Sequence, residues 1–273
     1  MSVRLRNAFV NMYELASTRL TGLYLDTIRE WDPSLDEIGD ILADSPGLRS
    51  IAIRNITMVL PEGFVPEPVV LNHLETLAIE AEDPMDLWSI LLLITSTSNA
   101  IRLSLSLTED PRCVSTAHAF FSRCRITMLH LHATDPAESL ISSLLVYMPH
   151  LRVVVLRDFT LTGETLQDFI TEHSITRNSP TLWPSLREIF LVKCNPTLYA
   201  LTKLGLLLRS SCTISIIDEL GLEPHQTNDE IELRRSAEDE LSHYGVHVQF
   251  LEPEDDPSVN WSFVYDYSPQ KLL

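Results

Sequence analysis

The stretch Leu74-Glu75-Thr76-Leu77-Ala78-Ile79 carries an apolar-x-x-apolar-x-apolar pattern that decides the fold, because the same pattern returns along the chain. Seven copies begin at positions 20, 48, 74, 100, 126, 151 and 186, so successive copies are 28, 26, 26, 26, 25 and 35 residues apart. Two weaker copies begin at Ser211 and Gly245. One such pattern is common in ordinary strands, but its return at a near-constant interval predicts a chain built from structural repeats.

The segments between these expected strands carry signals of helices. Four of them begin at or close to a proline, which suits the first helical turn: residues 84–96, 111–124, 136–148 and 195–210. Strands joined by crossover helices run parallel, and units of strand, turn and helix at this period are typical of leucine-rich repeats. We therefore predict an α/β leucine-rich-repeat solenoid, a horseshoe with a parallel concave sheet and convex helices. It should contain about eight to nine units within residues 18–251.

The two ends and one insertion depart from this period. We expect residues 1–17 to form an N-terminal capping helix and residues 252–273 an acidic, aromatic C-terminal cap or tail, because a solenoid needs its terminal core covered. Aromatic residues alternate from Trp261 to Tyr267, which fits either an edge strand or a peptide that docks elsewhere. The polar insertion at residues 176–184 is either a binding loop or a surface excursion with Trp183 packed against the next strand.

The charge of the chain limits its partners. Thirty-eight acidic and twenty basic residues leave a formal charge of −18, while an apolar fraction of 45% is that of a folded protein. A chain this acidic repels a phosphate backbone, so we expect no nucleic-acid partner. A protein partner is favoured instead, and a basic protein is the natural electrostatic match.

Motifs for catalysis and targeting are not found in the sequence. It has no Gly-rich phosphate loop, no His-Glu-x-x-His and no Gly-x-Ser-x-Gly, so we expect no enzymatic activity and no cofactor. It has no secretory signal and no apolar run of bilayer length, and we expect a cytoplasmic or nuclear monomer without membrane contact. The four cysteines have spacings that suit neither metal nor redox pairs, and we interpret them as buried thiols.

The expected concave face can be identified because side chains alternate across a strand. On that face Asp26, Arg54 and Glu80 form one column of charges, which is either a solvated row or part of a binding surface. The middle of the face mixes His and Arg with apolar residues, a composition typical of interfaces. The predicted partner-binding residues are Arg102, Ser104, Met128, His130, His132, Val155, Arg157, Glu188 and Phe190.

The alternative for this patch is a polar sheet face without a partner. We expect the side chains of Arg102, His130 and Arg157 to face solvent. His130 and His132 project from the same face of one strand, but the neighbouring strands offer no third ligand. We therefore expect no metal site.

Two strand starts resemble those of a known family. Trp183-Pro184-Ser185-Leu186-Arg187-Glu188-Ile189-Phe190-Leu191 and Met148-Pro149-His150-Leu151-Arg152-Val153-Val154-Val155-Leu156 look like the leucine-rich-repeat region of fungal F-box-type proteins. The resemblance covers residues 18–251, and the acidic, aromatic C-terminus is also similar to that group.

In that family an N-terminal F-box docks the adaptor of a cullin-type ubiquitin ligase, while the repeats hold the substrate. The resemblance therefore implies substrate recognition for ubiquitination, with ubiquitin ligase subunits among the partners. No recognisable F-box is expected, because the first seventeen residues are too short to form one. The alternative function is a wrapping inhibitor or scaffold for a basic protein.

Overall fold

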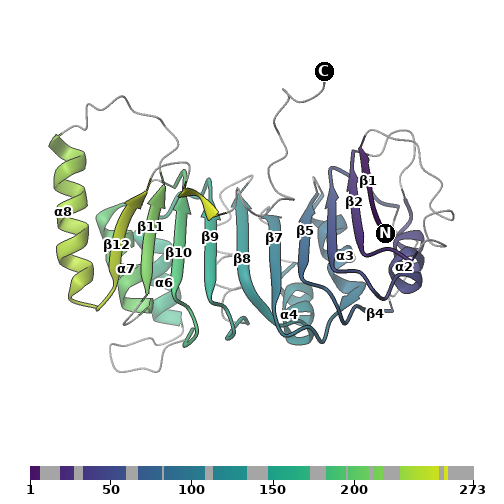
Figure 1. Ribbon diagram of the computed structural model, residues 1–273. Coiled ribbons are helices and arrows are strands. Elements are labelled where there is room, and N and C mark those ends of the chain that lie inside the picture. The colour runs from purple at the N-terminus through teal and green to yellow at the C-terminus, as the bar shows by residue number, and fades with distance from the viewer. Residues whose placement is uncertain are drawn as a thin grey trace, which may run out of the picture. The chain divides into compact units, whose positions relative to one another are not determined.

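The computed structural model shows an α/β fold with a ten-stranded parallel sheet (Figure 1). The strand order is β1-β2-β3-β5-β7-β8-β9-β10-β11-β12, so strands that neighbour one another in the sheet follow one another along the chain. The chain divides into two compact units, Met1–Met128 and Leu129–Leu273. The structure describes residues 1–6, 19–27, 33–59, 67–81, 83–107, 113–133, 147–172, 183–194, 196–208, 212–217, 228–251 and 255–257.

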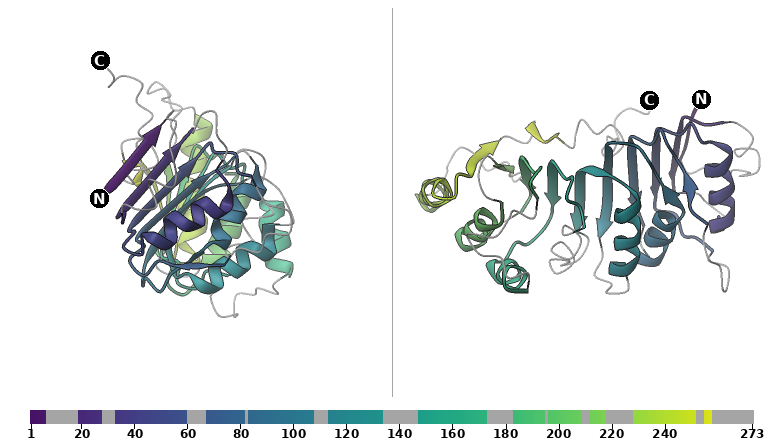
Figure 2. Two further views of the ribbon diagram at one scale, coloured as in Figure 1. Left: turned by 90° about the vertical axis from the view of Figure 1, so that its right-hand side faces the viewer. Right: turned by 90° about the horizontal axis from the view of Figure 1, so that it is seen from below.

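The first unit places helices on one face of its strands (Figure 2). Its long strands are β1 (Ser2–Arg6), β2 (Gly22–Asp26), β3 (Ser50–Arg54), β5 (Thr76–Glu80) and β7 (Ile101–Leu107), and β8 (Ile126–Ala133) begins at its end. Its helices are α2 (Leu35–Asp44), α3 (Pro84–Leu92) and α4 (Cys113–Arg123). Two short strands, β4 (Val69–Val70) and β6 (Ile94–Thr95), pair in a separate parallel sheet.

The register of the first unit confirms the predicted strand pattern. Parallel pairing places Leu23, Ile51, Leu77 and Leu103 in one row, and all four are buried. The residues between such apolar positions point to the face opposite the helices, because side chains alternate along a strand. We call this the front face of the unit. Its middle row consists of Arg4, Tyr24, Ala52, Ala78 and Ser104.

Local sequence explains where the helices of the first unit begin. Ser34 accepts a hydrogen bond from the backbone N–H of Glu37, and the Glu37 carboxylate accepts one from the backbone N–H of Ser34, so the two residues form a capping box for α2. Asp83 caps α3 by accepting a hydrogen bond from the Met85 N–H, and Pro84 fills the first helical position. The predicted helix at residues 84–96 is confirmed with an earlier end, at Leu92.

The strands are bounded by recurring turns. At three strand starts a leucine N–H donates to a carbonyl three residues earlier, at 3.1 Å in each: Ser45–Leu48, Met148–Leu151 and Trp183–Leu186. Proline occupies the second position of each turn, where its fixed φ fits. The residue after four of the strands has a left-handed backbone and donates its N–H to the last residue of the next strand, at 2.9–3.1 Å. These residues are Thr27, Asn55, Asp158 and Lys193.

The second unit repeats the same order of elements. Its strands are the end of β8, β9 (Val153–Arg157), β10 (Glu188–Val192), β11 (Thr213–Ile217) and β12 (His247–Leu251), and its helices are α6 (Gly163–Glu172), α7 (Leu198–Leu208) and α8 (Asn228–Ser242). Parallel pairing aligns Ile189 with Ile214 and Val248, so the two weaker sequence copies also have the predicted register. Gly205 in α7 permits a close approach to α8, because a Cβ there would lie 2.4 Å from the Leu241 side chain.

Some expectations for the ends and loops differ from the structure or lie outside the described residues. The N-terminal capping helix is wrong for Ser2–Arg6, which pair with β2 as strand β1 because their alternating side chains suit a sheet edge. Residues 7–17, the helix at 136–146, residues 176–182 and the aromatic residues 261–267 lie outside the described part of the chain. Trp183 is buried, as the surface-excursion alternative for the insertion requires.

Candidate functional site

The front face of the first unit carries a row of alternating charges on neighbouring strands. Arg6 on β1 pairs with Asp26 on β2, with Nε and Oδ2 3.2 Å apart. Arg54 on β3 pairs with Glu80 on β5, with Nε and Oε2 3.8 Å apart. The predicted column of Asp26, Arg54 and Glu80 therefore exists, and β1 supplies the counterion of Asp26 that sequence reasoning missed when it assigned these residues to a helix.

A second row on this face combines an aromatic ring with small and polar side chains. The guanidinium of Arg4 lies over the ring of Tyr24, with its carbon 5.2 Å from the ring centroid, which is within the range of a cation–π contact. Ala52 and Ala78 separate Tyr24 from Ser104 along the row. In the next row Thr76 donates a hydrogen bond to Ser50 at 2.9 Å. These contacts hold the polar groups of the face in fixed positions.

The front face of the first unit is positively charged although the chain is acidic. On its described strands two carboxylates, Asp26 and Glu80, accompany four arginines, so the face has a formal charge of +2 in a chain of −18. The arginines are Arg4, Arg6, Arg54 and Arg102. Arg4, Arg6 and Arg102 are exposed, whereas Arg54 is half-buried.

Part of the corresponding face of the second unit is buried, which corrects an expectation. His130 is 1% exposed and Arg157 is 6% exposed, whereas the sequence predicted that both side chains face solvent. Val155 and Phe190, which form one row on β9 and β10, are buried as well. Beyond their first residues β9 and β10 are therefore covered on both faces, and a strand buried on both faces cannot be recognised from alternation alone.

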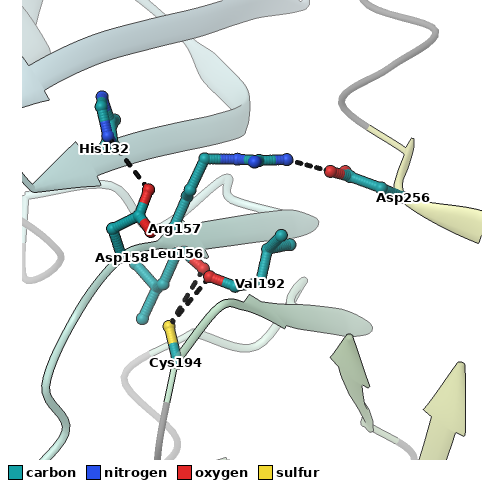
Figure 3. A network of polar contacts seen from close by, with 7 residues as sticks. All are labelled: His132, Leu156, Arg157, Asp158, Val192, Cys194 and Asp256. Atoms are coloured by element: carbon teal, nitrogen blue, oxygen red, sulfur yellow. Dashed lines mark hydrogen bonds and ion pairs between the residues drawn. The ribbon is translucent and has the colours of Figure 1, made fainter. Parts of the chain in front are cut away.

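One cause of this burial is an ion pair from the C-terminal part of the chain. The guanidinium of Arg157 at the end of β9 donates a hydrogen bond to the carboxylate of Asp256, which is itself 1% exposed (Figure 3). Asp256 lies five residues beyond the end of β12, and β10 and β11 separate β12 from β9 in the sheet. Residues 255–257, which follow β12 in the sequence, therefore lie at the front face of β9.

A half-exposed contact between a histidine and a carboxylate lies next to this buried ion pair. His132 on β8 and Asp158, which follows Arg157, are 3.1 Å apart between Nε2 and Oδ2 (Figure 3). Asp158 has a φ of 60°, and its N–H donates to the Val192 carbonyl. Among the described residues no group of three or more His, Cys, Asp or Glu side chains is placed to hold a metal ion.

The predicted binding residues thus differ in accessibility. In the first unit Arg102 is exposed, and Ser104 and Met128 are half-buried. In the second unit Glu188 is exposed and His132 is half-buried. The four buried residues are His130, Val155, Arg157 and Phe190. A partner could reach the exposed and half-buried residues directly, but it could reach the four buried ones only by displacing other parts of the chain.

Three cysteines are free and buried, as the sequence predicted. Burial raises the pKa of the Cys124 thiol to about 11 and those of Cys194 and Cys212 to about 12. The reactive form of a cysteine is its thiolate, so these thiols are almost inert near neutral pH.

We therefore expect the three thiols to resist labelling in the native protein. The test uses the Cys113→Ser variant, because the Cys113 side chain lies outside the described residues. With Ellman's reagent at pH 8, labelling should be at least about a hundredfold slower than in urea, since a rise of two pKa units lowers the thiolate fraction about a hundredfold and a rise of three lowers it further. Rapid labelling of the native variant would contradict the burial.

None of the helices in the described part of the chain has the length and apolarity needed to cross a bilayer. No protein-family model matches the chain, and the search of curated proteins found no match either.

Proposed function

We propose that this chain is a leucine-rich-repeat protein-binding module that holds a partner against the front face of its first unit. The observation that carries the proposal is the set of exposed arginines on that face, in a chain whose overall charge is strongly negative. The repeated strand register and the recurring left-handed turns support the repeat architecture.

The composition of the face suits protein recognition. Arg and Tyr are enriched among the residues that contribute most to binding energy at interfaces. Tyr24 and Arg4 are already in contact, and Arg6 is paired with Asp26, so these side chains lose less conformational freedom when a partner binds. Arg102 at the other end of the face is exposed and can form a bidentate pair with a partner carboxylate.

We consider two cellular roles for this binding module. The resemblance to F-box-type repeat regions supports substrate recognition for a cullin-type ubiquitin ligase. The charge of −18 supports the alternative, a wrapping inhibitor or scaffold for a basic protein. The +2 charge of the front face favours the first of these for a partner that docks on this face, because a basic surface would meet like charges there.

The experiment is site-specific photo-crosslinking in a native lysate. Benzoylphenylalanine is placed at Ser104 on the front face, or at Met85, which is 36% exposed on α3 and serves as the control on the helix side. We expect the Ser104 position to crosslink a specific protein that the Met85 position does not. Charge reversal by Arg102→Glu should lower the yield at least tenfold, and high salt should lower it too.

The possible outcomes separate the candidate functions. A crosslinked substrate recovered together with cullin or adaptor subunits supports ubiquitin ligase recognition, and a single basic protein supports the inhibitor or scaffold. Crosslinks from Met85 alone would show that the front face of the first unit is not the binding surface. A Ser104 crosslink that Arg102→Glu leaves unchanged would show that Arg102 does not contribute to binding there.

A further inference from the structure

We infer that Arg157 forms a carboxylate-binding site on the front face of the second unit, which Asp256 occupies in the free chain and which an acidic segment of a partner protein takes over. This site lies in a different unit from the surface proposed above, and the inference does not depend on that surface. It follows from the placement of one buried cation, its carboxylate and the apolar residues beside them.

The pair has the geometry of a built recognition site. Arg157 and Asp256 are 99 residues apart in the sequence, yet the guanidinium Nη2 donates directly to the Asp256 Oδ2. The side chain of Arg157 is 7% exposed and that of Asp256 is fully buried. Figure 3 shows Asp256 approaching from a separate segment, while Arg157 extends from the strand toward it. The Asp256 carboxylate therefore occupies the position that the carboxylate of an acidic residue from a partner would take.

The surroundings of Arg157 make a carboxylate necessary. Arg157 is aligned with Val192 on β10, Ile217 on β11 and Leu251 on β12, all three of which are apolar. A guanidinium among buried apolar groups is poorly hydrated, and leaving it unpaired costs much more than the complete pair contributes. Arg157 consequently favours any state in which a carboxylate faces it, whichever chain supplies that carboxylate.

Exchange of one carboxylate for another changes the energy of this site little. The ion pair, the hydrogen bond and the buried cation are kept, so the two states differ mainly in how the carboxylate is attached. Asp256 is joined to the sheet by a short connection from Leu251, which gives it an effective concentration on the order of millimolar. An external acidic segment that also contacts the apolar residues beside Arg157 can compete with Asp256 for Arg157 at millimolar concentrations.

The segment that carries Asp256 is suited to being displaced. The described residues Asp255–Pro257 pair with no strand of the sheet, and Asp255 is exposed. Displacement would therefore break few backbone hydrogen bonds within the described residues. The ligand class that fits is a peptide segment that presents an aspartate or glutamate, because the site offers one buried cation beside Val192 and Ile217.

The test uses the full chain and a fluorescent peptide that copies residues 252–258, Glu-Pro-Glu-Asp-Asp-Pro-Ser. Binding is measured by fluorescence anisotropy. Asp256→Asn should bind the peptide at least tenfold more tightly than the wild-type chain, because the Asp256 carboxylate no longer competes for Arg157. Asp255→Asn, the neighbouring exposed control, should behave like the wild type. A peptide with asparagine in place of the aspartate at position 256 should bind none of them.

Two further variants decide between this site and general charge attraction. Adding Arg157→Gln to Asp256→Asn should remove the gained binding, whereas adding Arg187→Gln, at an exposed arginine just before β10, should keep it. A folded Asp256→Asn chain that binds the peptide no better than the wild type would overturn the inference. So would binding that persists in the Arg157→Gln double variant.

A measurement on the wild-type chain covers the case in which Asp256→Asn does not fold. Hydrogen exchange at the Asp256 amide should accelerate when the peptide is added at about 10 mM, several times the effective concentration of a short tether. The asparagine-containing peptide should leave the exchange unchanged. Equal exchange with both peptides would show that the site does not exchange its carboxylate.

Discussion

Leu129→Asp should prevent folding, whereas Met128→Asp should give a folded protein. Leu129 is fully buried in β8, in the apolar row that faces the helices. An aspartate there would either be buried without a partner or stay protonated, at a cost of several kcal/mol. That cost is comparable to the total stability of a typical domain, about 5–15 kcal/mol. Circular dichroism and a urea titration of the purified variants measure the effect.

Met128 provides a matched control because it is the adjacent residue of the same strand. Its side chain points to the other face and is half-buried, so a carboxylate at this position stays in contact with water. We expect Met128→Asp to cost about 1 kcal/mol or less, the usual effect of a substitution away from the core. A folded Leu129→Asp variant, or equal losses at the two positions, would show that the register of β8 is wrong.

Asp86→Ala should lower the free energy of unfolding by about 2–3 kcal/mol, because it removes the partner of a buried backbone group. Asp86 is 4% exposed in the first turn of α3, and its Oδ2 accepts a hydrogen bond from the N–H of Met58 at 3.2 Å. The bond joins α3 to the segment that follows β3. Urea unfolding monitored by circular dichroism gives the difference between variant and wild type.

The conservative variant separates the hydrogen bond from the rest of the side chain. Asp86→Asn keeps an oxygen that can accept from the Met58 N–H but removes the charge, so we expect a loss of about 1 kcal/mol. If Asp86→Asn were as destabilising as Asp86→Ala, the charge and not the hydrogen bond would be the stabilising element. If both were neutral, the Met58 amide would have found another partner.

The strands were predictable because the sequence signals that specify them lie within each strand. The apolar spacing and the alternation of side chains fixed the rows that contain Leu77 and Ile189, and the register followed from the constant position of these rows in each repeat. Helix α2 was also predictable in principle, since the Ser34 and Glu37 pair is a known start signal and Pro33 directly precedes it, but the predicted helices did not include this segment. β1 was missed because Ser2–Arg6 is short and has no proline or glycine boundary.

The state of the candidate site was not predictable in the same way. Whether Arg157 is exposed depends on Asp256, and nothing in the local sequence of either residue indicates that they meet. The acidic residues near position 255 were visible in the sequence, but seventeen arginines were available as partners. The exposure of Arg102 was predicted correctly, because it follows from strand alternation alone.

The left-handed residues that end four of the strands also affect how such a chain can change in length. Each of these residues, for example Thr27 or Asn55, uses its N–H to reach the last carbonyl of the next strand. Each of these four strands is thereby attached to its successor through the same backbone joint. Duplication or loss of a whole strand-and-helix repeat preserves this joint. Deletion of one residue within the joint shifts the strand by one residue, which moves its side chains to the opposite faces of the sheet. Length variation in such a chain should therefore come in whole repeats or in the segments between the helices and the strands.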